Sequence, residues 1–246
     1  DDLKDFHVNR VFIEGALVAE EGKYLPEIKK CDISSVKGSV IVKDFSKEKF
    51  KMNLKSNKVN VIKILPGGVV TAKDTAEIEL DANGEFVRNP EVDLVKVAVV
   101  ERHQGTGNVA CGFLKGYGIK EGAVALSVAH DSHNIIVVGV NDEEMEFAVN
   151  SLIEQEGGIV LVKEGKVIES MPMPIAGLMS DQSGEWVDQK LTDIHEKAYE
   201  ELGICGDVEP VMTLCFMSLA VIPEIKLTDM GLFDVTTFSF IPVEVE

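Results

Sequence analysis

The sequence predicts an α+β fold, with mainly antiparallel β-sheets and about three helices in the C-terminal half. Runs rich in β-branched residues fill residues 49–100 and are interrupted by turn residues such as Pro66-Gly67-Gly68. Within this region the pair Asn83-Gly84 suits the positive φ of a tight hairpin turn. Apolar residues at helical spacing appear in the second half of the chain.

Strands are expected from the start of the chain. Apolar and polar positions alternate over residues 8–25 on either side of Glu20-Glu21-Gly22-Lys23, which predicts two short strands joined by a turn. The other predicted strands lie at residues 39–42, 58–64, 69–80, 92–100, 109–114, 123–129, 135–140, 159–162, 167–168 and 234–245.

Three helices are predicted after residue 140. Asn141 can cap the first helix, with Glu144 at its third position returning a hydrogen bond to the cap, and Gly157-Gly158 ends it. The second helix spans residues 184–202, with Gly203 just past its end. The third is expected at residues 211–219, before Pro223.

The composition narrows the class of protein. The chain has 246 residues, enough for one large domain or two smaller ones. Its 42 acidic and 24 basic side chains give a net charge of −18, which argues against nucleic acid or an anionic membrane as partner. Its four cysteines form no C-x-x-C pair, which favours a reducing, cytoplasmic location. The chain does not begin with Met, so we expect a piece of something longer.

One dense polar cluster, His130-Asp131-Ser132-His133-Asn134, lies between two strongly apolar runs. Its position between two predicted strands is common for binding and catalytic groups. Three interpretations stay open. His130 and His133 could bind a metal with Asp131, the polar side chains could only hold a turn, or the cluster could hydrogen-bond or cap an active site.

A second candidate is Arg102-His103, which follows a predicted strand and precedes a Gly-rich loop. It could face a cleft, or Arg102 could pair with a carboxylate at the surface. Gly105-Thr106-Gly107 and Gly116-Tyr117-Gly118 complete no phosphate-binding motif. Ser180-Asp181-Gln182-Ser183 is most simply a helix start.

Several long segments of the second half resemble the C-terminal region of adenine deaminases, which belong to the amidohydrolase superfamily. The resemblance is strong over residues 95–240. The segments that carry it are Val100-Glu101-Arg102-His103, Gly112-Phe113-Leu114-Lys115-Gly116-Tyr117-Gly118, residues 127–139 around the polar cluster, Pro174-Ile175-Ala176-Gly177-Leu178-Met179-Ser180 and Ile222-Pro223-Glu224-Ile225-Lys226-Leu227-Thr228-Asp229.

The resemblance implies a hydrolytic reaction in which adenine and water give hypoxanthine and ammonia. It implies manganese or iron in a (β/α)₈ barrel, where the metal activates water. This chain has five histidines, none in the His-x-His spacing that opens such a barrel, and no eightfold alternation of strands and helices. We therefore expect the barrel to lie upstream and no metal to be bound by this chain.

The resemblance also divides the chain and suggests a role. Residues 1–45 are similar to the small β domain that follows the barrel, and residues 46–246 to the C-terminal domain. The leading hypothesis is that residues 130–134, with Arg102 and His103, cap the active site or touch adenine. The alternatives are a structural or oligomerisation module, and an autonomous metallohydrolase using His103, His130 and His133. We expect a homo-oligomer.

Overall fold

The structure is a computed structural model that describes residues 4–245. The chain separates into two compact units, Asp1–Ser35 and Val36–Glu246. The predicted α+β class is confirmed, since three α-helices accompany sheets that are almost wholly antiparallel. None of the helices within the described residues is long and apolar enough to cross a membrane.

The first unit is a small antiparallel sheet of three strands, β1 (Arg10–Ile13), β2 (Ala16–Glu20) and β3 (Lys23–Tyr24). The sequence predicted two strands, because the turn at Glu14-Gly15 was not foreseen. Both of its residues adopt positive φ, 51° and 82°. None of residues 4–35 is buried, so this sheet has no core of its own.

The second unit is built on an eight-stranded sheet with the order β13-β12-β10-β11-β8-β9-β4-β5. Neighbouring strands are antiparallel except β4 and β9, which run parallel. The strands are β4 (Lys58–Ile64), β5 (Thr71–Glu77), β8 (Leu94–Val100), β9 (Val109–Lys115), β10 (Ala123–Leu126), β11 (Ile135–Gly139), β12 (Gly158–Lys163) and β13 (Lys166–Pro172). A 3-10 turn, η1 (Ser34–Val36), spans the boundary between the units.

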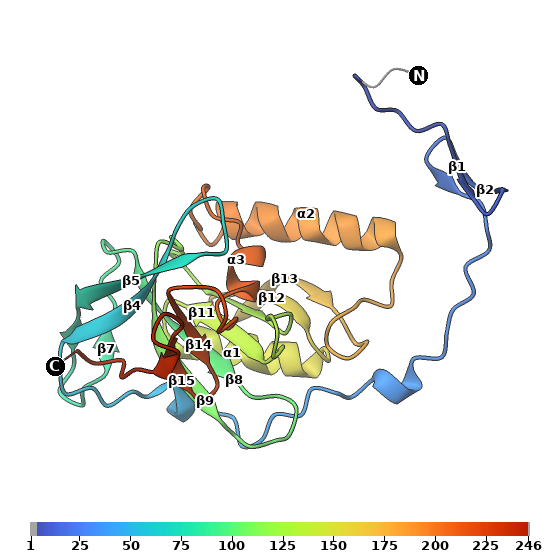
Figure 1. The fold of residues 1–246 in the computed structure, drawn as a ribbon. Coiled ribbons are helices and arrows are strands. Elements are labelled where there is room, and N and C mark those ends of the chain that lie inside the picture. The colour runs from blue at the N-terminus through green and yellow to red at the C-terminus, as the bar shows by residue number, and fades with distance from the viewer. Residues whose placement is uncertain (1–3, 246) are drawn as a thin grey trace. The chain divides into compact units, whose positions relative to one another are not determined.

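Both faces of the central strands are covered. Alternate residues of β8 and β10 belong to two separate apolar clusters, one packed against α2 (Gly184–Glu200) and the other against α1 (Asp142–Glu154). Figure 1 shows α2 lying across one side of the sheet, with α1 among the strands on the other side. Burial on both faces explains why β8 and β10 show no alternation of polar and apolar residues and, apart from Lys96, are wholly apolar.

The two long helices begin where the sequence predicted. Asn141 Oδ1 accepts from the Glu144 amide at 2.8 Å, and the Ser183 hydroxyl accepts from the Trp186 amide at 3.3 Å. The reciprocal half of the first cap is not formed. The Glu144 carboxylate instead accepts from the Gly165 amide at 3.1 Å, which ties α1 to the hairpin of β12 and β13.

Three local predictions were wrong. The third helix, α3, spans only Met212–Cys215. The closing strand predicted at residues 234–245 is reduced to β16 (Ser239–Phe240), because Asp234 ends the preceding strand β15 (Gly231–Asp234) and its carboxylate accepts from the Thr236 and Thr237 amides to form a turn. Residues 39–42 form no strand, and the Ile41 amide instead donates to the Arg102 carbonyl at 2.8 Å.

Two smaller sheets complete the unit. β14 (Ile225–Thr228), β15 and β16 form an antiparallel sheet. β6 (Glu79–Leu80) and β7 (Phe86–Val87) form the hairpin predicted at Asn83-Gly84, with Gly84 at φ 78°.

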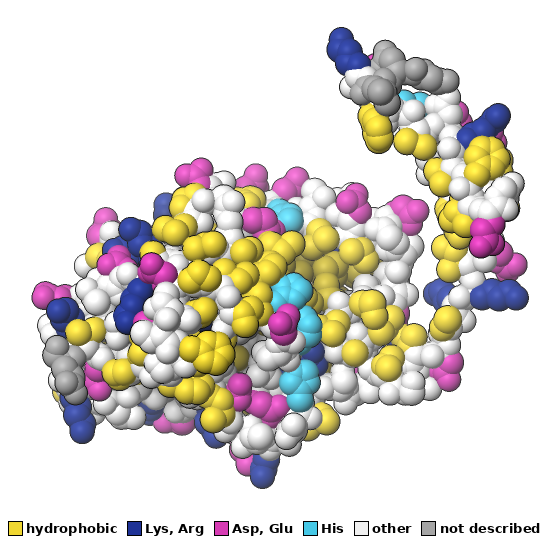
Figure 2. Space-filling view, in the orientation of Figure 1, with side chains coloured by type: hydrophobic (Ala, Val, Ile, Leu, Met, Phe, Trp, Pro, Cys, Tyr) yellow, Lys and Arg dark blue, Asp and Glu magenta, His cyan; other side chains and the backbone are white. Residues whose placement is uncertain are grey.

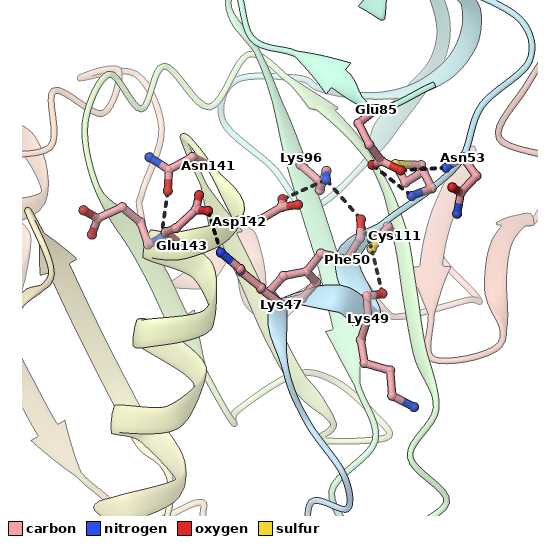
Figure 3. A network of polar contacts seen from close by, with 12 residues as sticks. Lys47, Lys49, Phe50, Asn53, Glu85, Lys96, Cys111, Asn141, Asp142 and Glu143 are labelled. Atoms are coloured by element: carbon pink, nitrogen blue, oxygen red, sulfur yellow. Dashed lines mark hydrogen bonds and ion pairs between the residues drawn. The ribbon is translucent and has the colours of Figure 1, made fainter. Parts of the chain in front are cut away.

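A lysine interrupts the otherwise apolar strand β8. Lys96 is 6% exposed, and its ammonium donates to Asp142 Oδ1 at 2.7 Å and to the Phe50 carbonyl at 3.0 Å. Figure 3 shows this network joining the start of α1 to the segment around the 3-10 turn η2 (Lys47–Phe50), where Lys47 also pairs with Glu143 at 2.9 Å. Lys96 therefore connects the sheet to two segments that pack on it.

We expect Lys96→Met to lower the free energy of unfolding by about 2 kcal/mol, because the partly exposed Asp142 carboxylate and the Phe50 carbonyl both lose their partner. Urea denaturation of this chain would measure the loss. Lys163→Met is the matched control. Lys163 Nζ lies 2.8 Å from the carboxylate of Glu121, whose side chain is 55% exposed. Loss of such a surface pair costs at most about 1 kcal/mol. Equal losses in the two variants would contradict a special role for Lys96.

Candidate functional site

The register of the central sheet brings the two candidate motifs of the sequence together. Residues 130–134 connect β10 to β11, as predicted from the two apolar runs. In the antiparallel pair of β8 and β11, Val100 lies opposite Ile135. The residues that follow Val100 and those that precede Ile135 therefore meet where the two central strands end.

Arg102 is the centre of this meeting point. It is 1% exposed, and its Nε donates to the His133 carbonyl at 2.5 Å while its Nη2 donates to the Ala176 carbonyl at 3.2 Å. Burial lowers the pKa of the guanidinium, and neighbouring Glu101 opposes the shift. The alternative of a surface arginine paired with a carboxylate is wrong, because its side-chain partners are backbone carbonyls in the interior.

Gly177 packs against the same guanidinium. A Cβ at this position would lie 2.7 Å from Arg102 Nη1, and the residue has a φ of 70°. Both the limited space and the left-handed backbone conformation therefore favour glycine. The Nη1 atom is buried and has no hydrogen-bond partner within the part of the chain that the structure describes.

Glu101 fixes the loop that carries His103. Its buried carboxylate accepts from the amides of His103, Gln104 and Thr106 at 2.5, 2.8 and 2.9 Å. Burial alone would raise the pKa of this carboxyl, but these amides and the Thr106 hydroxyl outweigh it and lower the pKa to about 2. His103 Nε2 in turn lies 2.7 Å from the Ser132 carbonyl.

His130 and His133 lie side by side. Their ring centroids are 5.5 Å apart, and the His130 ring packs on Phe216 at 4.8 Å. Backbone bonds hold both residues: the His130 amide donates to the Cys215 carbonyl at 2.8 Å, and the His133 amide to the Ala129 carbonyl at 2.6 Å. No hydrogen-bond partner for either imidazole occurs among residues 4–245, and His133 Nδ1 is buried.

The environment of His133 favours its neutral form. Burial lowers the pKa of this imidazole below its usual 6.5, and the nearby His130 and Arg102 lower it further. A neutral imidazole has one donor and one acceptor nitrogen, so it can both give and accept a hydrogen bond near neutral pH.

Asn134 has a structural task. Its side chain is 4% exposed, its Oδ1 accepts from the Arg102 amide at 3.3 Å, and its Nδ2 donates to Asp229 Oδ1 at 3.2 Å. Asp131 and Ser132 are exposed at the tip of the loop. The cluster therefore combines residues that hold the loop with residues that present side chains to the surface.

The sequence did not single out Glu101, Phe216 or Asp229, although all three contact the candidate residues. Glu101 and Asp229 lie inside segments that carry the family resemblance, which is the one signal that could have pointed to them. Phe216 lies in the segment predicted as a helix, so nothing in its spacing indicated an aromatic support for His130.

Metal binding by the cluster is not supported by the geometry. Within residues 4–245, no three His, Cys, Asp or Glu side chains are arranged to hold a metal ion. The set His103, His130 and His133 is therefore not such a site. Figure 2 shows histidine side chains in a column beside a broad patch of hydrophobic side chains on one face of the molecule.

A cavity of about 470 Å³ lies elsewhere, between η2 and the start of α1. Its lining contains Lys47, Lys96, Asp142 and Glu143, whose charges pair with one another, and none of the candidate residues. It is therefore not part of the candidate site.

The lowered pKa of His133 predicts a pH effect on stability. Between the folded pKa and 6.5 the unfolded chain binds more protons, so the free energy of unfolding falls as the pH drops below 6.5. We expect His133→Asn, which tolerates the φ of 52° and cannot titrate, to reduce the difference in unfolding free energy between about pH 7.5 and about pH 5.5. Urea denaturation at the two pH values measures this difference, and the His7→Asn substitution at an exposed position is the control. If the difference in unfolding free energy is the same in His133→Asn as in the original chain, the predicted contribution of His133 is wrong.

Comparison with known proteins agrees with the resemblance found in the sequence. A family model described as the adenine deaminase C-terminal domain matches residues 68–239. The chain is 66% identical over 244 residues to adenine deaminase 2 of Desulfotalea psychrophila, covering 99% of this chain and 42% of that protein. It is 46% identical over 246 residues to adenine deaminase of Ligilactobacillus salivarius, covering 100% of this chain and 43% of that protein. Its identity to adenine deaminase 2 of Carboxydothermus hydrogenoformans is 44% over 243 residues, covering 99% and 42%.

The chain spans less than half the length of these curated relatives. The family model covers well over half of the chain, so the resemblance to the C-terminal region is confirmed. The chain belongs to the adenine deaminase C-terminal domain family.

Proposed function

We propose that this chain closes the substrate site of a full-length adenine deaminase, with the face that carries His130 and His133 turned toward adenine. The observation that supports it best is the pair of adjacent imidazoles. The backbone amide of each histidine is fixed by a hydrogen bond to a carbonyl, while the two rings have no hydrogen-bond partner among the described residues. Side chains that are fixed in position but unpaired are suited to a ligand.

The reaction would be hydrolytic, giving hypoxanthine and ammonia from adenine and water. Neutral His133 could hydrogen-bond a ring nitrogen of the purine or hold a proton near the amine that leaves. Water activation by manganese or iron is expected of the family. The described residues do not fit such a metal, so no metal-dependent step is assigned to them.

Arg102, Asn134 and His103 have a positioning role in this proposal. Arg102 binds the His133 carbonyl, Asn134 binds the Arg102 amide, and His103 binds the Ser132 carbonyl. Each fixes the backbone of the loop. Asp131 and Ser132, at the exposed tip, are candidates for direct contact with adenine or with the barrel.

The first unit belongs to the same proposal. None of residues 4–35 is buried, and Phe12 and Ile13 are each 58% exposed. A sheet of three short strands without a core needs another surface to be stable. We assign this unit, expected from the sequence at residues 1–45, to the small β domain that follows the barrel, although Val40, Val42 and Phe45 pack within the second unit. The proposal extends to a cytoplasmic enzyme that assembles as a homo-oligomer.

In the full-length enzyme, His133→Ala should lower kcat/KM for adenine about 10-fold or more, because a hydrogen bond to the substrate is lost. The metal content should stay unchanged. Steady-state kinetics and metal analysis would measure both. His195→Ala is the matched control, because His195 lies on α2 and pairs with Glu209.

The runner-up is a structural or oligomerisation module whose polar loop only holds its own turn, as the backbone contacts of Arg102 and Asn134 favour. Under that alternative, His133→Ala would lower the melting temperature and leave turnover per folded molecule intact. This outcome would overturn the proposed role.

We also expect this chain alone to release no ammonia from adenine, because its described residues form no metal site. An ammonia-release assay with manganese or iron added, run beside the full-length enzyme, tests this expectation. Turnover by the isolated chain would instead support the autonomous metallohydrolase.

A further inference from the structure

A cluster of aromatic side chains stands exposed at the edge of the C-terminal sheet. The rings of Phe238 and Phe240 each pack edge-on against Phe233, at 5.2 Å between centroids. Phe238 is 72% exposed, Phe240 is 55% exposed, and Met230 in the turn between β14 and β15 is 67% exposed. We call Met230, Phe238 and Phe240 the aromatic face.

The structure holds these side chains outward. The turn before Phe238 is fixed by the Asp234 carboxylate, which binds Thr236, Thr237 and Lys73. Phe238 itself has a φ of 52°, a left-handed conformation that is unfavourable for a bulky residue. A fixed turn that presents an aromatic ring to solvent in an unfavourable conformation indicates a contact with another surface.

The aromatic face lies beside the candidate site. A Cβ placed on Gly231 would be 3.7 Å from the Phe240 ring, and Met230 precedes this glycine. The next residue back, Asp229, accepts from Asn134 Nδ2 at 3.2 Å. A surface that covers Met230 would therefore lie close to Asp229, which holds the loop that carries His133.

The length of the relatives favours one surface as the partner of the aromatic face. The relatives contain more than twice the length of this chain, so a large part of each lies outside it. A second copy of this chain is the alternative partner, and the labelling experiment below distinguishes it. We propose that the aromatic face docks on the part of the full-length adenine deaminase that lies outside this chain. This inference rests on the proposed function, since it names the surface through which the site is closed.

Cysteine labelling in the native full-length protein tests the docking. Phe238→Cys is compared with Phe147→Cys, where Phe147 is 37% exposed on α1. Each variant is treated with a maleimide, and modification is read by mass spectrometry on the peptide that carries the new cysteine. In this chain Phe238 is the more exposed of the two, so docking must invert the order of the rates.

We expect the cysteine at position 238 to react at least about 10-fold more slowly than that at 147, because reaction would need local opening of the interface. Both should react alike after denaturation. Reaction at 238 as fast as at 147 or faster would overturn the docking. Protection that disappears on dilution would indicate a second copy, and would overturn the proposed partner.

A second measurement does not depend on a new cysteine. Phe238→Ser in the full-length protein should lower the melting temperature more than Phe147→Ser, although its ring is the more exposed of the two in this chain. An equal or smaller decrease would contradict the docking. Neither measurement uses activity, so the docking and the substrate role can fail separately. Protection of position 238 together with unchanged kinetics of His133→Ala would retain the docking and reject the substrate role. Fast labelling at position 238 together with a lowered kcat/KM of His133→Ala would reject the docking and retain the substrate role.

Discussion

The buried guanidinium of Arg102 is the contact on which the candidate site depends. Removing a charged group from water is costly unless hydrogen bonds replace those to solvent. Two backbone carbonyls, from His133 and Ala176, supply that replacement, and they belong to segments that are far apart in the sequence. Because the cost is offset only when both segments are in place, Arg102 links the position of the histidine loop to that of the loop around Gly177.

Arg102 and Lys96 show two ways of keeping a cation in the interior, near opposite ends of β8. Lys96 in β8 has a carboxylate, Asp142, and one carbonyl. Arg102, two residues beyond the end of β8, has carbonyls only, and its Nη1 has no partner among residues 4–245. The first arrangement neutralises a charge and connects packed segments. The second leaves a positive charge beside His133, which is one reason why the pKa of that imidazole is lowered.

The site itself is a combination of fixed backbone and free side chains. Glu101 organises the loop of His103, Asn134 connects Arg102 to Asp229, and Phe216 supports the His130 ring. These contacts account for the buried Asn134 without any ligand. They do not account for the two imidazoles, whose rings these contacts leave unpaired. This division is why a structural role for Asn134 and a ligand-facing role for His133 are compatible within one loop.

What the sequence determined by itself was local. Two kinds of feature depend only on hydrogen bonds or φ values within a few residues: the helix caps at Asn141 and Ser183, and the Asn83-Gly84 hairpin. Their residue types therefore predict them. The place of residues 130–134 between two strands was likewise visible as a sharp change from apolar to polar residues. Only the tertiary structure decided the burial of Arg102, because that depends on Val100 lying opposite Ile135 and on Ala176 arriving from a distant loop. It also decided the shortness of α3, where the packing of a short segment outweighs local propensity. The turn at Asp234 is local, because the carboxylate binds amides two and three residues further on, but it was not predicted from the sequence.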